Sequence, residues 1–64
     1  MERWYIWLRF YDWNGKVTGY SKYPDSFEHK HSAMRKAREV WGDDPPYISW
    51  FVSKEDPFTE RRFK

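Results

Sequence analysis

The sequence predicts an α+β fold with the order strand, strand, helix, strand (ββαβ). Three antiparallel strands in the order 2-1-3 carry one helix on one face. Three observations predict it: a hairpin turn between two β-rich runs, a helical repeat of small and apolar residues, and a third apolar run at 47–53. A strand that follows the helix and lies beside the first strand runs antiparallel to it. We expect a single domain over 1–53 and a C-terminal tail over 54–64.

The composition limits how such a chain can be stabilised. A chain of 64 residues buries only about 60% of the surface of its unfolded form. It contains no cysteine, which excludes disulfides and thiolate zinc sites. Aromatic residues make up 23% of the chain, and each can bury roughly 150–250 Å². These aromatic residues are enough to fill one small core, and the remaining ones can form a second aromatic surface.

The charge is mixed, with 12 Lys and Arg against 10 Asp and Glu and a formal net charge of +2. Nucleic-acid affinity would therefore depend on where the cations lie and not on their sum. The first apolar run, broken by Arg9, predicts neither a signal peptide nor a membrane span, so we expect a cytoplasmic protein without membrane contact. The size and composition are typical of accessory proteins encoded by phages or mobile elements.

The hairpin is predicted from residues 3–12 and 16–23, which flank Asn14-Gly15. This dipeptide favours a two-residue type I′ turn, because both turn positions need a positive φ. Such a turn fixes the cross-strand pairs that share one side of the hairpin: Trp13 with Lys16, Tyr11 with Thr18, Arg9 with Tyr20 and Trp7 with Lys22.

The opposite side of the hairpin is the predicted core face, since it holds the aliphatic residues and two very small ones. Gly19 opposite Phe10 and Ser21 opposite Leu8 would leave space for a helix to approach. The predicted core face consists of Trp4, Ile6, Leu8, Phe10, Val17, Gly19, Ser21 and Tyr23.

Residues 32–41 predict the helix, because an apolar stripe repeats with a period of 3.6 residues. Gly42 is the predicted stop. The start stays open between Asp25 and Ser32: Asp25 with Glu28 resembles a capping box, but that start would place Lys30 in the stripe. The stripe consists of Ala33, Met34, Ala37, Val40 and Trp41.

After a rigid DDPP loop, residues 47–53 predict a third strand. Its core-facing residues would be Ile48, Trp50 and Val52. In the tail, Asp56-Pro57 is a candidate N-cap and first position of one helical turn.

A single helix covers one side of the sheet, so the other side would be an aromatic patch studded with cations. Its expected members are Tyr5, Trp7, Arg9, Tyr11, Trp13, Lys16, Thr18, Tyr20, Lys22, Tyr47 and Phe51. Single-stranded nucleic acid suits such a surface, because bases stack on rings at about 1–3 kcal/mol each while cations contact phosphates. The predicted binding residues are Trp7, Arg9, Tyr11, Lys16, Tyr20, Lys22 and Phe51.

Two alternatives use the same residues. Tyr, Trp and Arg are enriched at interface hot spots, so the patch could bind a protein, as a small inhibitor, an accessory protein or a homodimer. In the other alternative, the tail folds back and lays Phe58 and Phe63 over the patch, which becomes a second small core.

The outer face of the helix carries a second set of cations: Lys30, Arg35, Lys36 and Arg38. A solvated surface with an Arg35/Glu39 pair is one interpretation, and contact with a phosphate backbone is the other. His29 and His31 would diverge by about 200° on a helix, so they are not expected to chelate a metal.

No catalytic constellation is visible in the sequence. An enzyme would need a nucleophile beside a base, paired carboxylates in a cleft or a phosphate-binding glycine loop. The acidic pairs at 43–44 and 55–56 lie next to prolines, where they serve as caps and solubilising groups. We expect a non-enzymatic binding domain without a metal or other cofactor.

Overall fold

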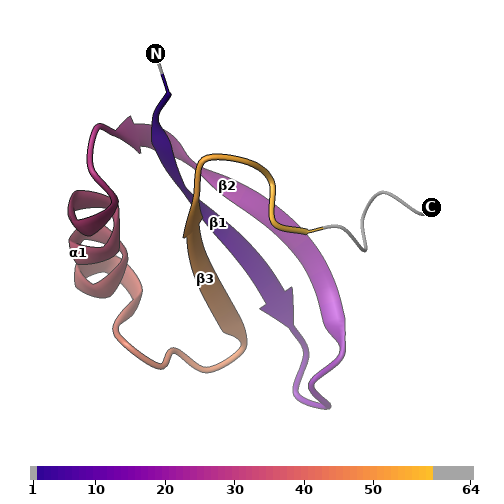
Figure 1. Ribbon diagram of the computed structural model, residues 1–64. Helices are drawn as coiled ribbons and strands as arrows, with labels where there is room; N and C mark the ends of the chain where they lie inside the picture. The colour runs from indigo at the N-terminus through magenta and orange to yellow at the C-terminus, as the bar shows by residue number, and fades with distance from the viewer. Residues whose placement is uncertain (1, 59–64) are drawn as a thin grey trace.

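Three antiparallel strands and one helix make up residues 2–58, the part of the chain that this computed structural model describes (Figure 1). The strands are β1 (Trp4–Tyr11), β2 (Val17–Phe27) and β3 (Ile48–Ser53), and the helix is α1 (Lys30–Trp41). The sheet order is β2-β1-β3. The predicted α+β fold and its strand order are therefore confirmed.

The hairpin turn is one residue longer than predicted. The Asp12 amide donates to the Lys16 carbonyl at 2.8 Å, which leaves Trp13, Asn14 and Gly15 as the loop. Of these only Gly15 has a positive φ, 84°. The Asp12 carboxylate explains the change, because it accepts bonds from the amides of Asn14 and Lys16, each at 2.9 Å. The prediction of a two-residue turn was wrong.

Beyond this turn, the pairing of β1 with β2 returns to the predicted register. Tyr11 pairs with Val17 instead of Thr18, and an irregularity at Thr18 then restores the predicted register. Arg9 lies opposite Tyr20 and Trp7 opposite Lys22, as predicted. The pairs predicted for Trp13 with Lys16 and for Tyr11 with Thr18 are not formed.

A second irregularity lies near the end of β2, where residues 23–25 oppose the single residue Ile6 of β1. Proline cannot donate to the ladder, and Pro24 falls within this bulge. The strand resumes with Ser26 opposite Tyr5, so β2 is longer than the predicted return strand. Because β2 extends to Phe27, the helix begins only at Lys30.

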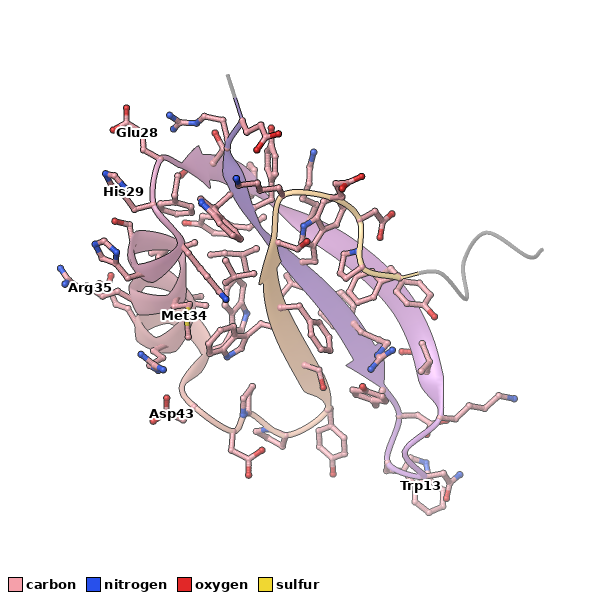
Figure 2. All side chains as sticks on the ribbon, viewed as in Figure 1. Trp13, Glu28, His29, Met34, Arg35 and Asp43 are labelled. Atoms are coloured by element: carbon pink, nitrogen blue, oxygen red, sulfur yellow. The ribbon has the colours of Figure 1, made fainter. Side chains whose placement is uncertain are left out.

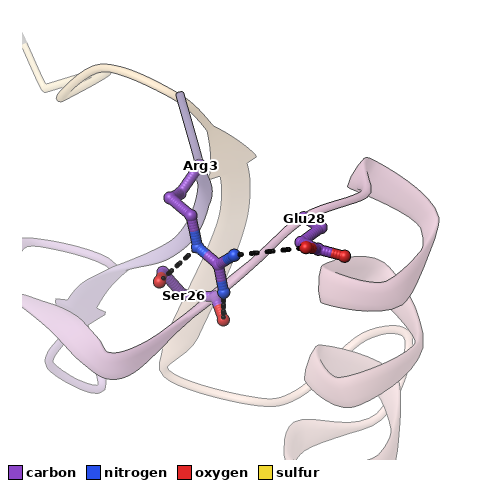
Figure 3. A network of polar contacts seen from close by, with 3 residues as sticks. All are labelled: Arg3, Ser26 and Glu28. Atoms are coloured by element: carbon purple, nitrogen blue, oxygen red, sulfur yellow. Dashed lines mark hydrogen bonds and ion pairs between the residues drawn. The ribbon is translucent and has the colours of Figure 1, made fainter. Parts of the chain in front are cut away.

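The capping box predicted at Asp25 and Glu28 is not formed. The N-cap of α1 is His29, with extended backbone and no capping bond from its side chain. Glu28 instead lies 3.9 Å from the Arg3 guanidinium, which donates to the Ser26 hydroxyl and carbonyl at 2.9 and 3.0 Å (Figure 3). These contacts tie the start of β1 to the end of β2.

The core lies between α1 and the sheet. Ala33 and Ala37 are fully buried against Ile6 and Leu8. Small helix residues allow close approach, and larger side chains close the rim of the core. These are Trp4, Phe10, Tyr23, Phe27, Trp41, Ile48, Trp50 and Val52.

Three expectations about the core were wrong. Val40 is 48% exposed, because the row Ala33, Ala37, Trp41 makes the contact and Val40 lies beside it. Val17 is also exposed, since the irregularity at Thr18 breaks the alternation that placed it on the core face. A Cβ at Gly19 would meet no atom within 4 Å, so no helix approaches there.

The C-terminal end of α1 is hydrogen-bonded to β3. Gly42, with φ 83°, ends the helix as predicted and donates its amide to the Arg38 carbonyl at 2.8 Å. The Trp50 indole donates to the Gly42 carbonyl at 2.9 Å. β3 begins one residue later than predicted, because Tyr47 has a positive φ of 64°. Within residues 2–58, no helix is long and apolar enough to span a membrane.

Candidate binding face

The side of the sheet that faces away from α1 carries a cluster that we call the aromatic face. Its strand residues lie in register: Trp7 is flanked by Lys22 and Phe51, and Arg9 by Tyr20 and Ser49. Six of the seven predicted site residues lie here, and Lys16 lies in the turn. The aromatic face consists of Tyr5, Trp7, Arg9, Tyr11, Tyr20, Lys22, Phe51 and, from the tail, Phe58.

Phe58 fills the centre of this face. The segment after β3 crosses the sheet toward β2 (Figure 1). The Phe58 ring lies 4.9 Å from Tyr20, 5.5 Å from Phe51 and 6.4 Å from Trp7, measured between centroids. As a result Phe58 is 2% exposed and Trp7 9% exposed. This contact belongs to the alternative in which the tail covers the patch; Phe63, its other half, lies outside the described residues.

The backbone of the tail is held where it begins to cross. The Asp56 carboxylate accepts a hydrogen bond from the Phe58 amide at 2.9 Å. This bond between an aspartate side chain and the amide two residues later closes an Asx turn. Residues 56–58 contain no helix, and the rest of the helical turn predicted at Asp56-Pro57 falls outside the described residues.

Arg9 is surrounded by rings. Its guanidinium carbon lies 5.2 Å from the centroid of Phe51 and 5.7 Å from those of Tyr11 and Phe58. Its Nε donates to the Tyr11 hydroxyl at 2.8 Å, which also accepts a bond from Ser49 at 3.1 Å. Cation–π contacts and this hydrogen bond fix the guanidinium at the surface of the face.

Lys22 forms the second cationic position. Its ammonium lies 4.7 Å from the Tyr5 ring and 5.5 Å from the Trp7 ring, while the residue remains exposed. The Trp7 indole below donates to the Ser53 carbonyl at 3.1 Å. The paired strands thus place two cations on this side of the sheet.

Four residues predicted for this face are not part of it: Thr18 lies at the irregularity in β2, and the other three lie at the end of the sheet. Trp13 and Lys16 belong to the hairpin turn, and Trp13 is 81% exposed at its tip (Figure 2). Tyr47 precedes β3 and is also exposed, while its carbonyl accepts a bond from the Tyr11 amide at 2.9 Å.

Three of the four cations predicted on the outer face of α1 have partners among residues 2–58. Lys36 pairs with Glu39 at 3.3 Å and Arg38 with Asp43 at 2.8 Å. The predicted pair of Glu39 with Arg35 is thus replaced by one with Lys36. The Lys30 ammonium lies 5.8 Å from the Trp4 ring. These contacts favour a solvated helix face over a surface that binds phosphates.

The two histidines do not diverge as predicted. Their rings lie 5.5 Å apart and are nearly parallel, with an angle of 12° between planes. The reason is that His29 is the N-cap, with φ −124° and ψ 143°, and so lies outside the helical repeat. Among residues 2–58, no group of three or more His, Cys, Asp or Glu side chains could hold a metal ion.

No known protein family, curated protein or solved structure matches the chain.

Proposed function

We propose that the protein is a non-enzymatic binding domain that holds single-stranded nucleic acid on the aromatic face. The observation that carries the proposal is the pairing of cations with rings: Arg9 lies over three rings and Lys22 over two. A nucleotide offers a π-face for the rings and a phosphate for the cations.

The burial of each residue divides the roles. Trp7 and Phe58 are buried at the centre of the face, so bases do not stack on them in this conformation. Tyr5, Tyr11, Tyr20 and Phe51 are partly exposed and offer ring surface at the rim. Arg9, Lys22 and the exposed Lys16 would contact phosphates.

The first test is a titration of the isotopically labelled protein with a short single-stranded oligonucleotide of mixed sequence. We expect amide shifts in β1 and β2 around Arg9 and Lys22, reversed by salt. Each phosphate contact on a single strand contributes a slope of about −0.7 to the logarithmic salt dependence. The double variant Arg9→Gln/Lys22→Gln should therefore bind more weakly, and the magnitude of its salt-dependence slope should be smaller by about 1.4.

The matched control is Lys36→Gln/Arg38→Gln, which removes the same charge from the outer face of α1. It should leave both the affinity and the slope nearly unchanged. Equal losses from the two double variants would mean that only net charge matters and would contradict a site on the aromatic face.

Protein binding is the second candidate, and the exposure of Trp13 favours it. A tryptophan at the tip of a hairpin, 81% exposed, is typical of an interface anchor. Such an interface would depend on Trp13 and only weakly on salt. Trp13→Ala should then abolish binding, whereas the nucleic-acid proposal expects little effect from it.

A further inference from the structure

The two edges of the sheet differ in a way that the proposed function does not use. The edge strand β2 breaks register with β1 twice and contains Pro24 and the charged residues Lys22 and Asp25. Bulges, proline and charges are the features by which proteins prevent a sheet edge from pairing with another strand. The β2 edge is therefore protected.

The β3 edge has none of these features. Its register with β1 runs without interruption from Ser53 opposite Tyr5 to Ile48 opposite Phe10. The strand, ISWFVS, contains no charged residue and no proline. A regular, uncharged, apolar edge strand is a ready template for pairing.

The alternation of hydrogen bonds along β3 shows which of its backbone amides and carbonyls point away from β1. The Tyr11 amide donates to the Tyr47 carbonyl, so residue 47 points its backbone toward β1. Antiparallel pairs alternate, so Ser49, Phe51 and Ser53 also point toward β1. The amides and carbonyls of Ile48, Trp50 and Val52 point away from the sheet. Among the turn, loop and cap hydrogen bonds within residues 2–58, none involves these groups.

Space for a partner lies beside this strand. A groove of about 320 Å³ follows the edge of β3 and the loop before it. Its lining residues are Asp43, Asp44, Pro45, Ile48, Ser49, Trp50 and Phe51.

We infer that β3 pairs with β3 of a second copy of this chain, antiparallel and around a two-fold axis at Trp50. This register brings the outward groups of the two strands together, with Trp50 opposite Trp50 and Ile48 opposite Val52. Aromatic and β-branched residues are favourable cross-strand neighbours, and no charge faces a like charge. The strand is thus complementary to itself, which an isologous interface requires.

The resulting dimer has a continuous six-stranded antiparallel sheet, three strands from each copy. Rotation about an axis perpendicular to the sheet keeps both helices on one side and both aromatic faces on the other. Pairing uses backbone groups of β3 and not Arg9 or Lys22, so it stands independently of nucleic-acid binding.

Sedimentation equilibrium of the full chain, from micromolar to millimolar and without nucleic acid, tests the inference. We expect a reversible monomer–dimer equilibrium. Chemical synthesis of the chain with an N-methyl group on the Trp50 amide removes an outward donor and keeps every side chain. Because the symmetry doubles the lost bond, dimerisation should weaken at least about tenfold.

The matched control is N-methylation of the Lys22 amide, which points outward on the β2 edge by the same alternation. It should leave dimerisation unchanged. Should the Trp50 derivative fail to fold, an isotope-filtered NOE experiment on the unmodified protein decides. The register predicts contact between the Ser49 Hα and the Phe51 Hα of the second copy, a pair that is not hydrogen-bonded and therefore close.

A monomer across the whole concentration range overturns the inference, even if a synthetic extended peptide binds at this edge. A dimer that is insensitive to the Trp50 methyl group, or that lacks the NOE between Ser49 and Phe51, overturns it too.

Discussion

Phe58 packs on Tyr20 with 4.9 Å between ring centroids, although the first residue lies in the tail and the second on the far edge strand. This contact shows that the chain turns back over the sheet after β3 and reaches the centre of the aromatic face. It makes the centre of the aromatic face, Trp7 and Phe58, a second, smaller core, while the rings at the rim stay partly exposed. A domain with a thin main core gains stability from burial on both sides of its sheet.

Truncation of Phe58 should therefore destabilise the fold. Removing a buried phenylalanine costs about 3–5 kcal/mol, which is a large part of the stability of a domain of this size. Urea unfolding followed by tryptophan fluorescence measures the loss for Phe58→Ala. Phe58→Leu keeps the protein measurable if the alanine variant is unfolded, and it should cost less. The control Trp13→Ala removes an exposed ring and should change the stability by no more than about 0.5 kcal/mol. Equal effects at positions 58 and 13 would contradict a second core.

The hairpin turn should depend on the Asp12 side chain. Asp12→Ala removes an acceptor that serves the amides of Asn14 and Lys16, and the loss should be about 1–2 kcal/mol. Thermal unfolding of the variant measures it, with Asp44→Ala in the exposed loop before β3 as the control. If Asp12→Asn restores most of the stability, hydrogen bonding and not charge closes the turn.

Two glycines on the same hairpin should respond differently to alanine. Gly15 has φ 84°, a left-handed conformation that costs roughly 1–2 kcal/mol for a residue with a Cβ, so Gly15→Ala should destabilise. Gly19 lies in β2 without a positive φ, and an added Cβ meets no atom within 4 Å. Gly19→Ala should be neutral or slightly stabilising, since it restricts the unfolded chain. Chemical denaturation of both variants checks the contrast, and a cost at Gly19 as large as at Gly15 would refute it.

The pH response of Glu2 follows from its ion pair. The Lys54 ammonium, 2.7 Å away, donates a hydrogen bond and holds the pKa of the Glu2 carboxyl below its ordinary value of 4.5. A depressed carboxyl pKa stabilises the folded state above the unfolded pKa, and that contribution disappears as the pH falls through the folded value. NMR titration of the Glu2 side chain should give a pKa below 4.5 that rises in Lys54→Met. An unchanged value in that variant would mean that the pair is absent in solution.

Much of the site was accessible from local sequence patterns. Arg9 opposite Tyr20 and Trp7 opposite Lys22 follow from strand alternation and an approximately placed turn, and both pairs occur in the structure. The places of Trp13 and Lys16 could not be predicted in this way. Asn14-Gly15 favours a two-residue turn, but the Asp12 carboxylate accepts hydrogen bonds from the Asn14 and Lys16 amides and so stabilises a loop that is one residue longer.

The sequence by itself determined the three strands, the helix and the two sides of the sheet, because the periods of 2 and 3.6 residues are local properties of the chain. The strand order followed from the rules for connecting these elements. Only the tertiary structure decided that Phe58 lies over Trp7, that Arg3 holds the end of β2, and that the helix begins after His29, which occupies the N-cap position. Those contacts depend on the path of the whole chain. Segments distant in sequence meet only after the sheet has formed, and no local period records which side of the sheet a tail will cross.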